Sequence, residues 1–422
     1  MHDNKKIYLV KLFNSNIDMK KIFLILLSFA CLVQTYSQIS QWRGENRDGI
    51  YNETGLLKQW PEDGPKLLWH YDELGAGHSS ASVTDDCIYV SGTTSDQNGF
   101  VLALDQNGNK LWQTEIGQEW FVDWEGVRSS PLVYNDKVYM LSSFGKLFCL
   151  NAETGEIIWN VDLFTTYEAE NIKWGLTENL LIDDGKLFVT LGGKDENVIA
   201  LNKDDGKLIW KSKGNGELSA YCSPMIIKIS DIKILVTQTQ SSILGIDASD
   251  GTLLWKHDYT NKWSVMANTP VYKDGFLYCF SGYGKGGVML KLSDDGKSIT
   301  EQWVDDNLDN QMGGVVVLNN RIYGAGQNNA KWFCLDWITG KVLFSDNFIK
   351  VGTIISAEGL LYCYGQDGKI ALVEPKDDSF NVISTFDVPY GEKYHWAHLV
   401  IHDKKLYVRH GTSLMVYDIS NE

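Results

Sequence analysis

The chain has 422 residues, enough for two or three ordinary domains or for one large repetitive domain. It carries 38 Lys and Arg against 54 Asp and Glu, a formal net charge of −16, and such an acidic body repels phosphate backbones, which excludes nucleic-acid binding as a main role. The 15 Trp, 20 Tyr and 39 Gly, beside only 7 Pro, indicate many short strands joined by glycine turns.

The N-terminal residues have the pattern of an export signal. A charged Met-Lys-Lys start at 19–21 precedes an apolar stretch over 22–33, and small residues place a cleavage site after Ser37. The apolar stretch is too short for a comfortable membrane span, and no later segment reaches that length, so no transmembrane anchor is expected. Residues 1–37 are therefore predicted to be an upstream extension plus a signal peptide, and the mature protein to be exported to the periplasm or cell surface. Cys31 leaves a lipoprotein alternative open.

One pattern recurs after this signal: an apolar strand, a polar turn ending in Gly, and a short strand ending in an aromatic residue. It reads VLALDQNGNKLW at 101–112, LFCLNAETGEIIW at 147–159 and VIALNKDDGKLIW at 198–210, and it continues with variations to residue 386. Alternating apolar residues mark half-buried strands, and Asp or Asn followed by Gly is typical of tight turns. Each copy is thus a predicted hairpin, with the aromatic packed between neighbouring repeats.

The spacing of the aromatic predicts the architecture. It recurs every 41 to 51 residues, at Trp69, Trp112, Trp159, Trp210, Trp255, Trp303, Phe344 and Phe386. A repeat of this length with four strands is typical of a propeller blade. The chain ends before a further aromatic, and PKLLW at 65–69 supplies the missing strand. We therefore predict an all-β, eight-bladed propeller over 65–422, with four-stranded antiparallel blades closed by 65–69 and with 38–64 packing on it.

The repeat unit, A-L-D/N-x-x-T-G-x-x-x-W, resembles that of quinoprotein dehydrogenases, which hold pyrroloquinoline quinone (PQQ) on an eight-bladed propeller. It is also similar to the repeat of the outer-membrane assembly lipoprotein, a propeller without a cofactor. The opening QWRGENRDGIY (41–51) and the run WGLTENLL (174–181) resemble a group of exported bacterial quinoprotein-like propellers. The resemblance covers roughly residues 41–419. It implies the fold more strongly than the chemistry, because one fold carries many functions.

The long connections indicate which face carries function. With the strands of a blade named A to D from the axis outward, the D–A and B–C connections share one face, and the longest lie at 117–128 and 161–177. Long loops in a compact repeat fold are often functional, so the ligand face is predicted to be the D–A side. Residues that enter strand A are expected to line the mouth of the central channel: His78, Arg128, Glu178, Tyr221, Asn268 and His395.

Tryptophans outside the periodic position form a second set of candidates. Those on or beside D–A loops are Trp120, Trp124, Trp174, Trp263 and Trp396. Exposed aromatic rings there can stack on a sugar ring or a planar cofactor. The alternative is that they fold down as lids over the blades.

The quinoprotein resemblance implies landmarks that the sequence only partly supplies. Such enzymes use a disulfide between adjacent cysteines, a calcium site of Glu, Asn and Asp, and a catalytic Asp, whereas this chain has no adjacent cysteines and no haem attachment motif. Glu178 and Asn268 are candidate calcium ligands and Asp123 is a candidate base. His395 and His398 would point to opposite faces of a strand, so no metal site is predicted from them. The six cysteines after the signal are expected to be small hydrophobes of the core.

Three functional hypotheses follow, and whether the protein is an enzyme stays open. The leading one is an exported, non-catalytic propeller that needs no cofactor and binds a glycan, a small molecule or an envelope protein on its D–A face. The alternative is a PQQ-dependent alcohol or sugar dehydrogenase that uses PQQ with calcium. A third is a polysaccharide lyase, for which His78, Tyr221 and Arg128 supply the residue types needed for proton abstraction and carboxylate neutralisation.

Overall fold

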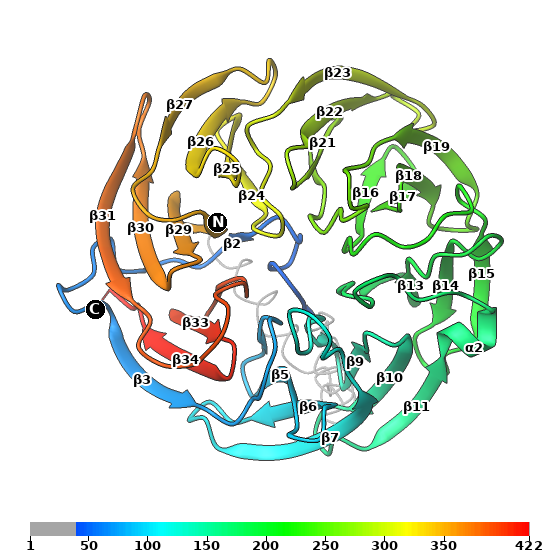
Figure 1. Cartoon of the computed structure of the whole chain (residues 1–422), viewed down its shortest axis with the longest axis horizontal. Coiled ribbons are helices and arrows are strands. Elements are labelled where there is room, and N and C mark those ends of the chain that lie inside the picture. Colours follow the sequence, from blue (N-terminus) through cyan, green and yellow to red (C-terminus); the bar gives the residue numbers. More distant parts are fainter. Residues whose placement is uncertain (1–38, 422) are drawn as a thin grey trace, which may run out of the picture. The chain divides into compact units, whose positions relative to one another are not determined.

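The structure, a computed structural model, describes residues 39–421. The predicted signal peptide, the cleavage after Ser37 and the lipidation at Cys31 lie outside these residues. The described chain is all-β, as predicted: its strands form eight sheets arranged in a ring (Figure 1), and its one helix is α2 (Leu163–Tyr167), which lies in the long connection after the second blade. Among the described residues no helix is long and apolar enough to cross a membrane.

Each sheet is an antiparallel blade whose four main strands follow one another in space. The strands of blades 1 to 4 are β4 (Ser82–Val83), β5 (Ile88–Thr93), β6 (Asn98–Leu104), β7 (Lys110–Gln118); β8 (Leu132–Tyr134), β9 (Lys137–Leu141), β10 (Lys146–Asn151), β11 (Ile157–Asp162); β12 (Leu181–Asp183), β13 (Lys186–Val189), β14 (Val198–Asn202), β15 (Leu208–Ser212); and β16 (Met225–Ile229), β17 (Ile232–Gln238), β18 (Ser242–Asp247), β19 (Leu253–Asp258).

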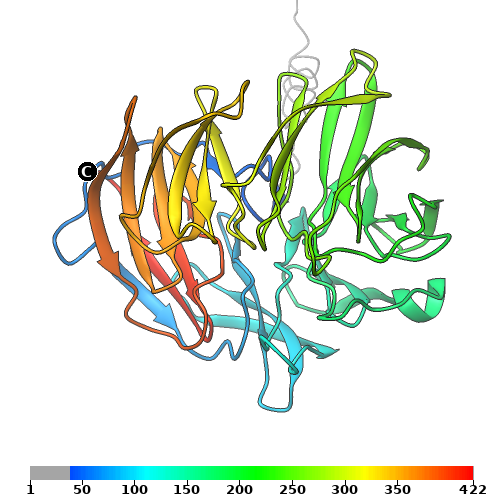
Figure 2. The same cartoon turned by 45° about the horizontal axis from the view of Figure 1, so that its top comes forward.

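Blades 5 to 8 repeat this order, and Figure 2 shows several of them standing side by side. Their strands are β20 (Val271–Lys273), β21 (Phe276–Ser281), β22 (Gly286–Leu292), β23 (Ile299–Asp305); β24 (Val315–Leu318), β25 (Arg321–Gly326), β26 (Lys331–Asp336), β27 (Val342–Asp346); β28 (Gly352–Ala357), β29 (Leu360–Gly365), β30 (Lys369–Pro375), β31 (Phe380–Asp387); and β32 (Val400–His402), β33 (Lys405–His410), β34 (Ser413–Asp418) with β3 (Lys66–Tyr71).

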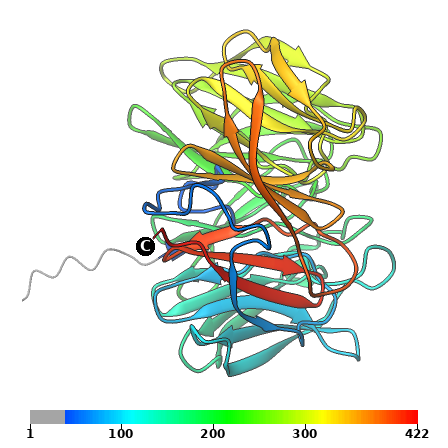
Figure 3. The same ribbon diagram turned by 90° about the vertical axis from the view of Figure 1, so that its left-hand side faces the viewer.

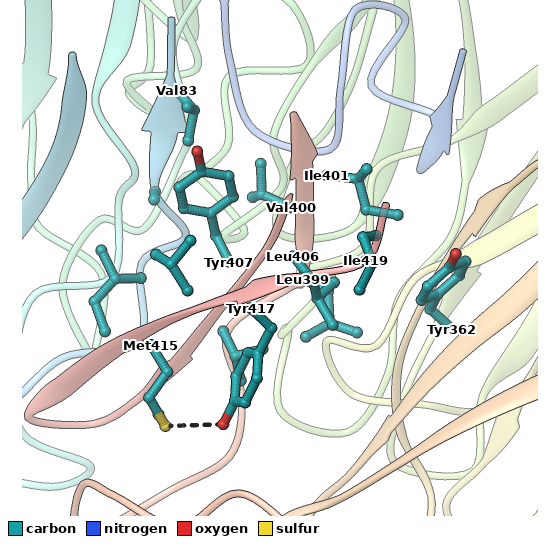
Figure 4. Packing of buried hydrophobic residues seen from close by; sticks show 14 of the residues in the cluster. Val83, Tyr362, Leu399, Val400, Ile401, Leu406, Tyr407, Met415, Tyr417 and Ile419 are labelled. Carbon is teal, nitrogen blue, oxygen red and sulfur yellow. Dashed lines mark hydrogen bonds between the residues drawn. The ribbon is translucent and has the colours of Figure 1, made fainter. Parts of the chain in front are cut away.

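The predicted closure by the N-terminal strand is confirmed. β3 pairs antiparallel with β34, so the strand that begins the propeller is the outermost strand of its last blade. Buried side chains of this blade, including Leu406, Tyr407 and Met415, pack in one cluster with Val83 of blade 1 and Tyr362 of blade 7 (Figure 4). Figure 3 shows the dark-blue N-terminal segment beside the red strands of this blade, where the Leu57 amide donates to the Ile419 carbonyl at 2.8 Å.

The periodic tryptophans join neighbouring blades, as predicted. Trp112 of blade 1 donates its indole N–H to the Ala152 carbonyl in the turn of blade 2, at 3.0 Å. The turn glycine of blade 2, Gly155, has a φ of 73°, and a Cβ there would meet the Trp112 ring at 2.5 Å. Glycine is thus needed for the left-handed turn and for the close approach of the ring. The same pairing joins Trp69 to Gly108, Trp159 to Gly206, Trp210 to Gly251 and Trp303 to Gly340.

Two short strands at the start of the described chain add to the ring. β1 (Ile39–Ser40) pairs antiparallel with the innermost strand β8, and β2 (Ile50–Tyr51) pairs parallel with the innermost strand β28. The segment between them therefore crosses from blade 2 to blade 7, and Figure 1 shows it in dark blue near the centre of the ring.

Candidate ligand cavity at the channel mouth

A cavity of about 430 Å³ opens at the centre of the ring, on the side of the D–A connections. Seven of the eight D–A connections supply lining residues, and Tyr283 joins them from the B–C connection between β21 and β22. Trp42, from the N-terminal segment between β1 and β2, completes the lining. The volume is within the usual range of small-molecule sites.

The repeat places one side chain of each contributing D–A connection in this cavity. The position lies four residues before the first residue of the innermost strand, and it is occupied by His78, Arg128, Thr177, Tyr221, Ala267, Gln311 and Trp396. Side chains two residues further along also line the cavity in three blades, at Asn179, Ser223 and His398. This spacing of two is that of an extended chain, whose alternate side chains share one face.

Glu178 and Asn268, expected at the channel mouth, are not among the lining residues. Each lies three residues before its inner strand, so its side chain points away from the cavity. Glu178 is buried and accepts the Thr190 amide at 2.8 Å, and its burial raises the pKa of its carboxyl to about 8. Aligning the strand starts in the sequence would have revealed this shift of one residue.

His395 and Trp120 also lie outside the cavity lining. The His395 ring stacks on His410 with ring centres 3.6 Å apart, and its Nδ1 lies 2.6 Å from the Tyr364 hydroxyl. Trp120 packs behind the cavity wall, with its ring 5.9 Å from the Arg128 guanidinium carbon. Of the eleven candidates named from the sequence, the structure brings seven together in the lining: His78, Arg128, Tyr221, Trp124, Trp174, Trp263 and Trp396.

Aromatic rings dominate the cavity wall. Five of the lining residues are tryptophans: Trp42, Trp124, Trp174, Trp263 and Trp396. Trp174 packs edge-on against Trp124 at 6.0 Å between ring centres and is tilted against Tyr221 at 6.3 Å. Trp124 and Trp263 remain about half exposed. The wall therefore offers flat apolar faces to a ligand that has ring faces of its own.

Arg128 holds two of the aromatic loops in place. Its Nη1 donates to the Trp174 carbonyl, and its Nη2 donates to the carbonyls of Asp123 at 3.1 Å and Trp124 at 2.8 Å. Arg128 thereby ties the connection that carries Trp124 to the connection that carries Trp174, at the point where these two rings meet. Burial lowers the pKa of Arg128 to about 10, and the group stays charged at neutral pH.

Two histidines in the lining are held neutral. Burial, followed by the charges of Arg409 and Arg128, lowers the pKa of His78 to about 3, although the backbone of Trp124 and Glu125 beside the ring acts in the opposite direction. Burial and the Arg43 charge also hold the pKa of His398 well below its usual range. Both rings therefore enter the cavity as neutral imidazoles at physiological pH.

The N-terminal segment forms the floor of the cavity. Trp42 packs edge-on against His398 with ring centres 5.0 Å apart, and the next residue, Arg43, is buried. Arg43 donates to the carbonyls of Val315 at 2.6 Å and Asp48 at 3.0 Å. Arg47 reaches blade 3, where it donates to the Leu180 carbonyl at 2.7 Å. The two arginines of QWRGENRDGIY thus anchor this segment to blades on different sides of the channel.

A ring of hydrogen bonds joins the blades around the channel. Each bond links one D–A connection or inner strand to the next, so the ring fixes the spacing of the cavity wall. The bonds are Ser80 N to Ser130 Oγ, Ser130 N to Asn179 Oδ1, Asn179 N to Ser223 Oγ, Thr269 Oγ1 to Ser223 O, Gly314 N to Asn268 Oδ1, Asn310 Nδ2 to Gly352 O, Thr353 Oγ1 to Ala397 O, and Ser80 Oγ to His398 O.

Several lining residues were not predicted from the sequence. Trp42 lies outside the repeat, Tyr283 lies on a B–C connection, and Lys173 looks like an ordinary surface lysine in sequence. Thr177 and Gln311 would have been found by the strand-start alignment, because they occupy the same position as His78 and Arg128.

The residues present do not fit a PQQ–calcium site. No Asp or Glu lines the cavity. Glu178 accepts the Thr190 amide of its own blade, and the Asn268 side chain bonds to the next blade at Asn310 and Gly314. The described residues contain no group of three or more His, Cys, Asp or Glu that would hold a metal ion. Asp123, the candidate base, is exposed beside the cavity and does not line it.

A family model described as outer membrane protein assembly factor BamB matches residues 97–346, more than half of the chain. The chain belongs to this family of PQQ-type repeat propellers. The BamB of Yersinia pestis is 22% identical over 307 residues, which cover 70% of this chain and 74% of that protein, and the BamB of Moranella endobia is 24% identical over 58% of this chain and 64% of its own length. The quinoprotein alcohol dehydrogenase PedH of Pseudomonas putida is 24% identical, over 39% of this chain and 27% of that enzyme.

Solved structures agree on the fold. BamB from Moraxella catarrhalis superposes with a TM-score of 0.59 at 14% identity, over 82% of this chain and 95% of that one. A europium-containing methanol dehydrogenase superposes with a TM-score of 0.64 at 13% identity, over 87% and 89%. At such low identity the likeness shows the fold alone. The propeller fold that the repeat resemblance implied is therefore confirmed.

Proposed function

We propose that this protein is an exported binding protein that takes a small ring-shaped ligand in the cavity at the channel mouth, without catalysing its conversion. The observation that carries the proposal is the cavity wall itself, in which five tryptophans and two tyrosines surround about 430 Å³. Sugar rings and planar aromatic rings both stack on such faces. The wall supplies polar groups for orientation, among them Asn179 and Ser223, but no carboxylate to act as a base.

The dehydrogenase alternative has weaker support. Quinoprotein relatives share the repeat and the fold, but the sequence match to PedH covers only 39% of this chain, and the donors near the cavity do not fit calcium. The lyase alternative keeps its residue types, since His78, Tyr221 and Arg128 all line the cavity. However, Arg128 donates hydrogen bonds to three loop carbonyls, which favours a positioning role over carboxylate neutralisation.

An envelope protein is the second candidate ligand. The family match to an outer membrane protein assembly factor favours it, and the same D–A face would present Trp124 and Trp263 to a partner, since both are about half exposed. Crosslinking in intact cells through a photoreactive residue at Trp263 would report such a partner directly.

The experiment uses the mature protein from Gln38 and the neutral fluorescent amine N-phenyl-1-naphthylamine. We expect saturable binding with energy transfer from the tryptophans, weakened about tenfold in Trp174→Ala. Tyr390→Ala is the control, because Tyr390 is an exposed aromatic of a D–A connection that does not line the cavity. Failure of the probe to bind, or equal losses in both variants, would count against the proposal. Dye reduction with PQQ, calcium and an alcohol would replace it with the dehydrogenase.

A further inference from the structure

The charges that line the cavity run opposite to those of the whole chain. The protein has a formal net charge of −16, yet the two ionised residues of the lining are Arg128 and Lys173. The lining is therefore less acidic than the rest of the protein, which favours negatively charged ligands over positively charged ones there. The chemistry of the lining therefore discriminates between ligands of different charge.

We propose that the cavity selects a ring compound that carries an acidic group, a carboxylate or a sulfonate, and that Lys173 is the residue that pairs with this group. The proposal rests on the proposed function, because it names the class of ligand taken by the same cavity. In this proposal the tryptophans stack on the ligand ring, and Lys173 beside them recognises its negative charge.

The position of Lys173 favours this role. Its Nζ lies 4.5 Å from the centre of the Trp174 ring and 5.6 Å from that of Trp263, so the ammonium contacts both rings and lies beside the parts of the wall that a ligand ring would cover. Lys173 takes part in none of the ion pairs found among the described residues, whereas many other lysines do. A ring stacked on Trp174 would thus bring its acidic substituent next to an ammonium whose charge is not neutralised.

Arg128 supports the same preference. It forms no ion pair among the described residues and donates its hydrogen bonds to neutral carbonyls, although the buried Glu119 offsets part of its positive charge. Since Arg128 holds the loops of Trp124 and Trp174, its removal would disturb the wall. Arg128 is therefore a positioning residue, and Lys173 is the better residue for a test.

The test compares two probes that differ by one acidic group. 1-Anilinonaphthalene-8-sulfonate carries a sulfonate, and N-phenyl-1-naphthylamine lacks it. We expect Lys173→Met to weaken the sulfonate probe about fivefold and to leave the neutral probe unchanged. Lys262→Met is the matched control: its Nζ lies 5.7 Å from the Trp263 ring, but Lys262 does not line the cavity, so neither affinity should change.

The outcomes separate the two proposals. If neither probe binds, or if Trp174→Ala affects neither, the proposed function fails. If both probes bind at the cavity but Lys173→Met weakens them equally or not at all, only the charge preference fails. Competition then distinguishes the sources of an acidic ring: displacement of the sulfonate probe by 2-naphthoate indicates an aromatic acid, and displacement by digalacturonate indicates a sugar acid. Equal displacement by neutral cellobiose would overturn the charge preference.

Discussion

Arg43 Nη1 lies 3.1 Å from His398 Nδ1, directly beneath the cavity. A guanidinium only donates hydrogen bonds, so His398 Nδ1 must be the acceptor and the ring proton must sit on Nε2. This nitrogen lies 2.9 Å from the Met312 carbonyl, which accepts that proton. One pair of side chains therefore links the N-terminal segment to two D–A connections and sets the tautomer of a histidine in the cavity wall.

Arg43→Met is expected to lower the free energy of unfolding by about 3 kcal/mol, because the buried carbonyls of Val315 and Asp48 lose their donor. Urea unfolding followed by circular dichroism measures the change. Arg321→Met is the control, since Arg321 lies at the rim and pairs with the exposed Asp377, and it should cost less than about 1 kcal/mol. Equal effects of the two substitutions would argue against a structural role for the N-terminal segment.

The tryptophan–glycine contact between blades is tested by two alanine substitutions at similar backbone angles. Gly155 and Gly185 have φ of 73° and 75°, so alanine costs about 1–2 kcal/mol at both positions. At Gly155 the added Cβ would also meet the Trp112 ring at 2.5 Å, whereas at Gly185 no atom lies within 4 Å. Gly155→Ala should therefore be less stable than Gly185→Ala by a further ~1–3 kcal/mol in urea unfolding. Similar urea unfolding midpoints for the two variants would show that the Trp112 ring moves aside without a loss of stability.

The buried carboxyl of Glu178 predicts a pH dependence of stability. Burial raises its pKa to about 8, so between pH 4.5 and 8 the folded protein keeps a proton that the unfolded chain has lost. Stability from this group is fully present below pH 4.5, falls as the pH rises towards 8 and is then constant.

Glu178→Gln should remove this slope, on the order of a few kcal/mol, when unfolding midpoints at pH 6.5 and pH 8.5 are compared. Glu115→Gln, an exposed carboxyl of β7, is the control and should keep the slope of the unsubstituted protein. A slope that survives in Glu178→Gln would contradict the assignment of a protonated Glu178.

The cysteines of the described chain are all free, and five of the six are buried. Only Cys87 is partly exposed, and burial raises the pKa of its thiol. We expect Ellman's reagent to modify Cys87 alone, and slowly, in the native protein, and all six thiols in urea. Cys87→Ser should abolish the native reaction. Fewer than six reactive thiols after unfolding under non-reducing conditions would instead reveal a disulfide.

Much of the fold could be read from local pattern. The interval between Trp112 and its equivalents predicted eight blades, and the strand at 65–69 predicted the closure, because a ring of hairpins leaves each repeat with the same neighbours. The cavity lies on the D–A side, which the long connections in the sequence indicate as the ligand face. The repeat and the loop lengths depend on residues close in sequence, whereas the closure joins β3 and β34 from the two ends of the described chain.

The cavity depended on contacts that no local pattern contains. Trp42 reaches it because Arg43 and Arg47 bond to carbonyls more than 130 residues away, and Glu178 leaves it because a shift of one residue turns an extended side chain to the other face. The amino-acid sequence by itself determined the repeat, its number and its closure. Only the tertiary structure decided which side chains meet at the axis, because eight connections and the N-terminal segment converge there from the whole length of the chain.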